Sequence, residues 1–310
     1  MARMARIKVD GEAAAYHLYG RISGVKGEYT LTKPLCRKTL IELIKHYATG
    51  YCCRVAALSV MGTHYHLVMQ FDAYRRLSPE ELRARALLLY PNSAADLDDW
   101  PQAKWDRLQE RLFDVSEFMR NLHSAFGRWY NKAYKRHGRF WADRFKSTLL
   151  ENDGALLDCM LYVELNAVRA GLVERPEDWK GSSLYLREAG QAAWLMPLTA
   201  FFEKTKKRAL TEYRSLVYYR GEVPTRTGQA AIPQRIVKEE ADRGFEVSGV
   251  YCKRLRYFVD GLVIGSEAFI RKHLDVLRED GHYVKRKHPI PQLEGLHLSL
   301  REQRSTAVSF

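Results

Sequence analysis

The segment Met61–Phe71, with the sequence MGTHYHLVMQF, constrains the fold of this chain more than any other. From His64 onward its side chains alternate in character. Every second position holds a large, mainly apolar group: Tyr65, Leu67, Met69 and Phe71. Because successive side chains of a β-strand point to opposite faces, the pattern predicts a strand with one buried apolar face. His64 and His66 then point together toward the other face.

Two imidazoles on one face of a strand can hold one divalent ion, since neutral imidazole is a common ligand for such ions. The pattern His-x-His is short, so two histidines on a half-exposed strand without a ligand remain the alternative. A structural zinc site would need two further strong ligands. The chain has no CxxC pair, and its cysteines are scattered at Cys36, Cys52, Cys53, Cys159 and Cys252. This usage argues against a disulfide framework and predicts reduced thiols in the cytoplasm.

Hydrophobic periodicity around the histidine strand predicts a mixture of strands and helices. The expected elements are a strand over 13–23, a helix over 34–50, a strand, turn and strand over 52–71, and helices over 78–90, about 105–134 and 155–170. Ser78 can cap the helix that begins there, and Glu81 would complete a capping box. Asn152 or Asp153 could cap the helix over 155–170.

The helix expected over 155–170 carries one polar stripe beside its apolar one. The stripe consists of Asp158, Tyr162, Asn166 and Arg169, at spacings of four, four and three residues. Tyrosine is a candidate covalent nucleophile. Its free phenol has a pKa near ~10, so a nearby cation or metal has to favour the phenolate. The alternative is a tyrosine that merely lies at the helix surface, and Tyr130 and Tyr134 are rival nucleophiles by residue type.

Three segments, in this order along the chain, resemble the REP-associated tyrosine transposases, which belong to the HUH class of single-tyrosine transposases. They are LSVMGTHYHLV (58–68), GRFWADRFKS (138–147) and YVELNAVRAGL (162–172). The resemblance covers roughly residues 10–190, with a helical insertion over about 78–110. Two positions depart from the family pattern: Thr63 stands where the family usually has Asn, and Ala167 where it usually has Pro.

The resemblance implies a ferredoxin-like α+β domain with an antiparallel sheet. It implies that His64 and His66 bind Mg²⁺ or Mn²⁺, assisted by Asn166. Tyr162 would cleave single-stranded DNA, commonly beside a hairpin, leaving a 5′-phosphotyrosine and a free 3′-hydroxyl. Relatives of this kind include monomers and homodimers, so the oligomeric state stays open.

The charge of the chain favours a polyanionic partner. Lys and Arg number 50 against 37 Asp and Glu, which gives a formal net charge of +13. Excess positive charge attracts nucleic acid or an anionic membrane, but no apolar run approaches a membrane span. Cations interleaved with aromatic residues can contact phosphates while the rings stack on bases or fill the core. The expected DNA-binding residues are Arg128, Lys132, Lys135, Arg136, Arg139, Arg144, Lys146 and Arg169.

Beyond the resemblance, residues 200–285 are expected to form a helical extension that contacts DNA, with breaks at Gly261 and Gly265. Its cations include Lys253, Arg254 and Arg256. Residues 286–310 read as a polar tail. Two other functions stay open: a non-catalytic DNA-binding regulator that keeps the fold, and a metal-dependent hydrolase of small phosphoesters. A DNA strand transferase would lie in the bacterial cytoplasm, at the nucleoid.

Overall fold

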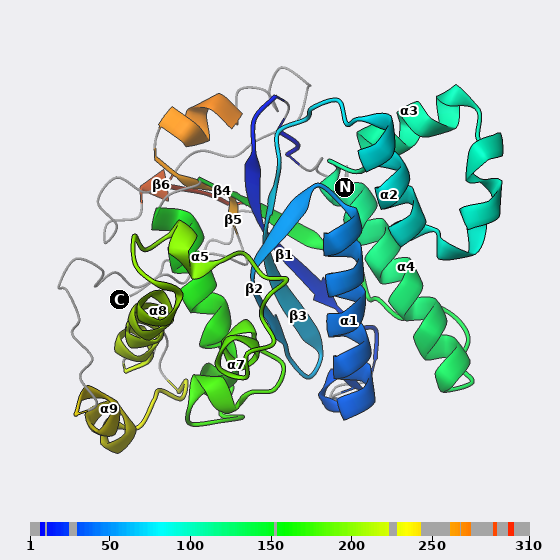
Figure 1. The fold of residues 1–310 in the computed structure, drawn as a ribbon. Coiled ribbons are helices and arrows are strands. Elements are labelled where there is room, and N and C mark those ends of the chain that lie inside the picture. Colours follow the sequence, from blue (N-terminus) through cyan, green and yellow to red (C-terminus); the bar gives the residue numbers. More distant parts are fainter. Residues whose placement is uncertain are drawn as a thin grey trace.

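A central β-sheet with helices on both faces organises the chain (Figure 1). The structure is a computed structural model. It describes residues 7–9, 11–24, 30–151, 154–222, 228–242, 261–266, 268–273, 288–289 and 297–300. The strand order is β2-β3-β1-β4-β5-β7-β6.

The first four strands and two helices follow the order β-α-β-β-α-β. They are β1 (Ala14–Arg21), α1 (Pro34–Gly50), β2 (Cys53–Val60), β3 (His64–Phe71), α4 (Val115–Ala133) and β4 (Lys146–Leu150). All three pairings among these strands, β2 with β3, β3 with β1 and β1 with β4, are antiparallel. This order and pairing define a ferredoxin-like unit, which confirms the predicted α+β fold class.

The alternation of β1 and β3 separates two cores. The apolar set of β3, together with Tyr16 and Leu18 of β1, packs against α1 and α4. The opposite face includes Val68 of β3 and Ala15 of β1, and it packs against helices that follow β4. Figure 1 shows α1 and α4 on one side of the sheet and α5, α7 and α8 on the other. His64 and His66 belong to the second face, as the strand pattern predicted.

Further helices are α2 (Pro79–Leu89), α3 (Gln102–Arg111), α5 (Gly154–Glu164), α6 (Asn166–Arg169), α7 (Ser183–Glu188), α8 (Lys206–Gly221) and α9 (Gln234–Ala241), and residues 268–273 are also helical. Short 3₁₀ helices span Thr30–Thr32, Pro91–Asp99, Pro176–Asp178 and Leu198–Ala200. Ser78 caps α2 by accepting a hydrogen bond from the Glu81 amide, as predicted. The Glu81 carboxylate binds Arg75 and Arg85 rather than closing a capping box.

The continuous helix predicted over 105–134 is wrong. It is divided into α3 and α4, because the Asp114 side chain accepts hydrogen bonds from the amides of Ser116 and Glu117 and starts a new helix. The carbonyl of Leu112 meanwhile accepts from the Cys52 amide, which ties the break to the sheet. Hydrophobic periodicity alone does not reveal a cap inside an apolar pattern.

The C-terminal segment is not purely helical as expected. Gly261–Gly265 forms β5, which pairs parallel with β4, and β7 (His297–Leu300) and β6 (His288–Pro289) extend the sheet antiparallel. The sheet is therefore mixed rather than antiparallel throughout. The two glycines expected to break a helix instead bound a short apolar strand whose Leu262, Val263 and Ile264 are buried. Such a run fits a strand that is covered on both faces.

The predicted caps Asn152 and Asp153 and the cations Lys253, Arg254 and Arg256 lie outside the described residues. The described cysteines Cys36, Cys52, Cys53 and Cys159 are buried thiols. Within the described part of the chain, no helix combines the length and apolarity needed to cross a membrane.

Candidate active site

The two predicted histidines lie side by side on β3, facing the helices that follow β4. His66 is buried, with 2% of its surface exposed, and His64 is half-buried. On the neighbouring strand β1, Tyr19 pairs with His66 and Arg21 with His64. The ring centroids of His64 and His66 are 5.1 Å apart, and Tyr19 contacts both rings. The shared face predicted from the alternation is thus confirmed.

A third histidine, His17 of β1, joins this face, although it lies outside the His-x-His motif. Its Nε2 lies 2.9 Å from Nδ1 of His66, and the two rings stack with centroids 5.1 Å apart. His17 and Tyr19 alternate on their strand just as His64 and His66 do, so a shared face was the available signal. The register that sets His17 beside His66 is a property of the strand pairing.

Burial keeps the predicted ligand imidazoles neutral. Desolvation, with the nearby charge of Arg21, lowers the pKa of His64 to about 4. Desolvation, and then the neighbouring His17 and His64, lowers the pKa of His66 well below its ordinary value. Neutral imidazole is the form that coordinates metal ions. Thr63, which replaces the usual Asn of the resembled family, lies with its Oγ1 3.1 Å from His64 Nδ1 and so helps to orient this ring.

The predicted polar stripe faces the histidines. Between residues 155 and 169 every side chain is buried except those of Asp158, Tyr162, Asn166 and Arg169, which are half-buried. The stripe runs across α5 and α6, which are separated only at Leu165. The Tyr162 ring packs edge-on against His66 and His17, with centroids 5.9 and 6.1 Å apart. The structure therefore brings the predicted nucleophile to the predicted metal ligands.

Glu164 anchors this helix from its buried side. Its carboxylate accepts hydrogen bonds from Ser183 Oγ at 2.5 Å, the Leu184 amide at 3.0 Å and Tyr213 Oη at 3.1 Å. Desolvation raises the pKa of Glu164 to about 7, although these hydrogen bonds favour the charged form. Glu164 thus connects α5 to α7 and α8.

Two side chains of the stripe carry buried polar atoms without a hydrogen-bond partner among the described residues: Nδ2 of Asn166 and Nη1 of Arg169. The Arg169 guanidinium lies over the Tyr162 ring, 5.3 Å from its centroid. Burial lowers the pKa of Arg169 to about 10, with Tyr162 opposing and Arg220 adding to the shift. Buried polar groups are normally paired, so these atoms mark a place where a ligand would supply partners.

The donor set agrees with a divalent ion held by few protein ligands. Among the described residues no three His, Cys, Asp or Glu side chains group as a candidate metal site. The Asn166 amide provides an oxygen and lacks a partner for its nitrogen. Mg²⁺ and Mn²⁺ accept such oxygen ligands, and Mg²⁺ commonly keeps several waters. The donor types of His64, His66 and Asn166 therefore fit the expected ion.

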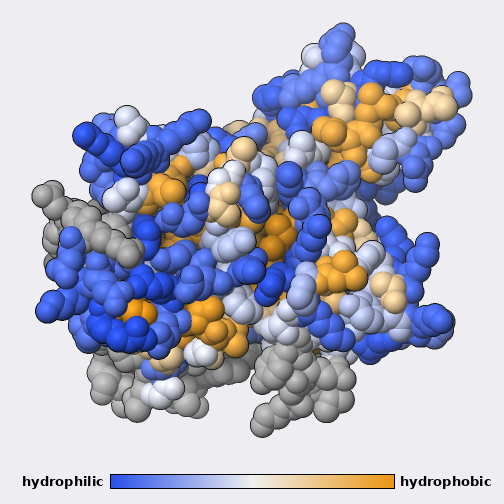
Figure 2. Space-filling model, turned by 60° about the horizontal axis from the view of Figure 1, so that its bottom comes forward, coloured by the Kyte–Doolittle hydropathy of each residue, from blue (hydrophilic) through white to orange (hydrophobic). Residues whose placement is uncertain are grey.

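The seven cations expected in the 128–146 region are all exposed: Arg128, Lys132, Lys135, Arg136, Arg139, Arg144 and Lys146. The loop that carries several of them runs along the end of β1, because the Ala142 amide donates to the Arg21 carbonyl and Trp141 bridges to Ile22. Lys146 pairs with Tyr19 on the histidine face. The face of the molecule seen in Figure 2 is mostly hydrophilic, with separate apolar patches.

The aromatic residues interleaved with these cations pack in or against the hydrophobic core. Phe126, Tyr130, Phe140 and Trp141 pack against one another on the α4 side of the sheet. The rival nucleophiles Tyr130 and Tyr134 therefore lie across the sheet from His66. Tyr130 is buried, and the contact with Cys36, followed by burial, raises the pKa of Tyr134 to about 12. Both features disfavour attack by either phenol.

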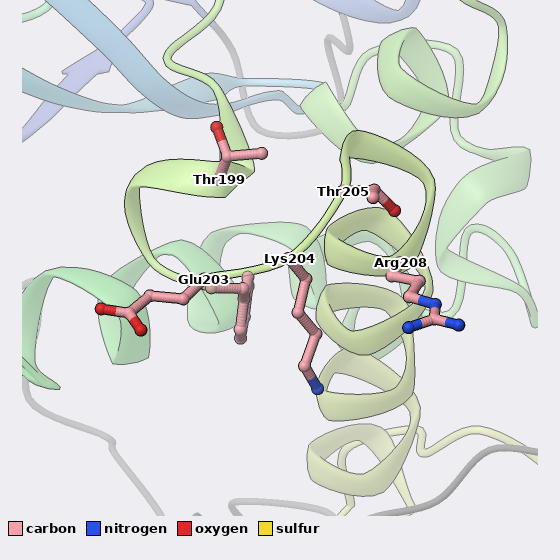
Figure 3. Close-up of a pocket in the computed structure, with 6 residues that line it drawn as sticks. Thr199, Glu203, Lys204, Thr205 and Arg208 are labelled. Carbon is pink, nitrogen blue, oxygen red and sulfur yellow. The ribbon is translucent and has the colours of Figure 1, made fainter.

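A pocket of about 530 Å³ lies at the start of α8, lined by Thr199, Phe202, Glu203, Lys204, Thr205 and Arg208. Figure 3 shows the charged ends of Glu203, Lys204 and Arg208 pointing away from one another. No polar groups converge on a ligand there, so the pocket does not compete with the site around Tyr162.

No family model and no curated protein matches this chain. Among solved structures, a REP-associated tyrosine transposase bound to a REP hairpin is similar at 15% sequence identity and a TM-score of 0.40. The similarity covers 61% of this chain and 86% of that one. A likeness at this level assigns neither a family nor an activity, so any assignment of function rests on the residues of the site.

Proposed function

We propose that this protein is a metal-dependent, single-tyrosine DNA strand transferase that cleaves and rejoins single-stranded DNA. The observation that carries the proposal is the contact of the Tyr162 ring with His66 and His17, one helical turn before the partner-less amide of Asn166. The motif resemblance points to the same residues. Hairpin-containing repeats are the proposed substrate class.

In the proposed reaction, Tyr162 Oη attacks the phosphorus of a DNA phosphodiester. The bond from phosphorus to Oη forms as the bond from phosphorus to the 3′-oxygen breaks, which leaves a 5′-phosphotyrosine and a 3′-hydroxyl. The phenol loses one proton and the 3′-oxygen gains one. One phosphodiester replaces another, so a 3′-hydroxyl can reverse the reaction and rejoin strands without an external energy source.

The residues of the chain divide the work. His64, His66 and Asn166 would hold Mg²⁺ or Mn²⁺, which when bound polarises the phosphate and offsets its charge. Arg169, above the Tyr162 ring, favours the phenolate through its positive charge. The sheet and α5 hold Tyr162 against the histidine face, which would keep the nucleophile close to the bound ion.

The exposed cations around residues 128–146 would hold the DNA backbone. Their loop follows the end of β1, where Arg21 pairs with His64. Contacts of this type bind phosphates without reading sequence, so affinity should fall steeply with salt. Single strands and hairpin stems both present the required phosphates.

The test is the covalent adduct. A 3′-labelled hairpin oligonucleotide with single-stranded flanks, taken from DNA beside the gene, is incubated with full-length protein and Mn²⁺ and resolved on a denaturing gel. The labelled 5′-phosphotyrosine fragment should migrate with the protein, and EDTA or Tyr162→Phe should abolish it. Tyr134→Phe is the matched control and should retain it.

Three outcomes contradict the proposal. Cleavage that persists in Tyr162→Phe assigns the nucleophile elsewhere. Tight DNA binding without an adduct in Mn²⁺ indicates a non-catalytic DNA-binding regulator. Hydrolysis of a small phosphoester without any adduct indicates a phosphoesterase.

A further inference from the structure

Helix α8 lies outside the region of motif resemblance, yet it places an arginine at the Tyr162 stripe. Arg220, near the end of α8, forms an ion pair with Asp158 of α5 at 2.5 Å. Both side chains are nearly buried, with 10% and 12% of their surfaces exposed. Asp158 stands one helical turn before Tyr162, so α8 reaches the face that carries the proposed nucleophile.

Two arginines act on this stripe. Arg169 is half-buried over the Tyr162 ring, and its Nη1 has no partner among the described residues. After burial, the groups that shift the pKa of Arg169 are Tyr162 and Arg220. No carboxylate among the described residues contributes to this shift. Arg220 and Arg169 repel each other, while Asp158 pairs with Arg220. Nearby buried cations are stabilised when an anion joins them.

We propose that Arg220 and Arg169 together form the subsite for the scissile phosphate, so that the extension helix α8 completes the active site. This inference rests on the proposed strand-transferase function. A guanidinium has five N–H donors, so Arg220 can hold Asp158 on one edge and a phosphate oxygen on another. Arg169 offers its partner-less Nη1 from a guanidinium that lies over the Tyr162 ring. The ligand class is a phosphodiester in the substrate and a tyrosine-linked phosphate in the intermediate.

Asp158 is assigned a positioning role that opposes phosphate binding. It orients Arg220 but competes electrostatically with the incoming anion. Removing the carboxylate should therefore strengthen phosphate binding, whereas removing the guanidinium should weaken it. If the ion pair were purely structural, both substitutions would change phosphate binding in the same direction, because either one breaks the pair.

The first experiment measures binding of inorganic phosphate to full-length protein without metal or DNA, from the rise in melting temperature across a phosphate titration. Arg220→Met should weaken the apparent phosphate affinity about 10-fold or more. Asp158→Asn should maintain or increase it. Arg208→Met removes an exposed arginine from the other end of the same helix and should leave it unchanged. The double variant Asp158→Asn/Arg220→Met avoids an unpaired buried charge and should bind phosphate as weakly as Arg220→Met.

The second experiment follows the rate of adduct formation on the labelled hairpin with Mn²⁺. Arg220→Met should slow it at least 10-fold relative to Arg208→Met. Equal phosphate affinity and equal adduct rates in these two variants would overturn the subsite, even if wild-type protein forms the adduct. An absent wild-type adduct contradicts the proposed function, and the phosphate titration still decides the subsite.

Discussion

The buried carboxyl of Glu164 should make the stability of the fold depend on pH. It is fully buried under α7 and α8, and its folded-state pKa of about 7 lies above the ordinary 4.5. When folding raises the pKa of a carboxyl, the contribution of that group to the free energy of unfolding is fully present below the unfolded pKa. That contribution is lost as pH rises from the unfolded to the folded pKa, because the unfolded chain then releases a proton that the buried group retains. The expected window of loss runs from about pH 4.5 to pH 7.

The magnitude follows from the shift. The difference between 7 and 4.5 is 2.5 pKa units. At about 1.36 kcal/mol for each unit this amounts to roughly 3.4 kcal/mol, of which about 2.5 kcal/mol falls between pH 5 and pH 8.5. Glu164→Gln keeps the size of the side chain and cannot ionise. Its amide nitrogen can donate to Ser183 and Tyr213 while its oxygen accepts from the Leu184 amide, at the positions that the carboxylate now occupies.

The assay is urea unfolding of wild type and Glu164→Gln at pH 5, 7 and 8.5, followed by circular dichroism. The difference in free energy of unfolding between the two proteins should shift by about 2.5 kcal/mol in favour of the variant across this range. Glu203→Gln, at an exposed position, should track wild type at every pH. Parallel pH curves for wild type and Glu164→Gln would refute the burial argument.

Three further predictions use the same stability and binding assays. Gly20→Ala should destabilise the fold by about 1–3 kcal/mol, because its Cβ would lie 2.5 Å from the Tyr65 ring. Gly154→Ala is the control, since a Cβ there meets nothing within 4 Å. Equal stabilities of the two variants would contradict this prediction. Tyr65→Phe should cost about 1 kcal/mol by removing the 2.8 Å hydrogen bond to His123, with no change in the adduct rate, since Tyr65 faces away from Tyr162. Lys146→Met should reduce the salt dependence of single-stranded DNA binding by a slope of about 0.7, and an unchanged slope would exclude a phosphate contact there.

Local periodicity was sufficient to predict the two halves of the candidate site, the histidine face and the Tyr162 stripe. Alternation in His64–Phe71 predicts the shared face of His64 and His66, since a strand places every second side chain on one side. Helical spacing likewise predicts the half-buried stripe that contains Tyr162 and Asn166. Both patterns depend only on neighbours along the chain, and the structure confirms both geometries. The metal and nucleophile roles of these residues remain proposals.

Other features depend on contacts between distant segments, which leave little trace in local sequence. His17 meets His66 through the register of β1 with β3, and β5 becomes a strand because it pairs with β4 more than 100 residues earlier. The break before α4 arises where Asp114 caps a new helix and the sheet binds Leu112.

The sequence by itself determined which residues share a strand face or a helix stripe, because those periods are set by backbone geometry. Only the tertiary structure decided that the histidine face of the sheet meets the Tyr162 stripe. It also placed Arg220 of α8 against Asp158. Those contacts follow from the burial of two apolar cores on opposite sides of one sheet, which is a property of the whole chain.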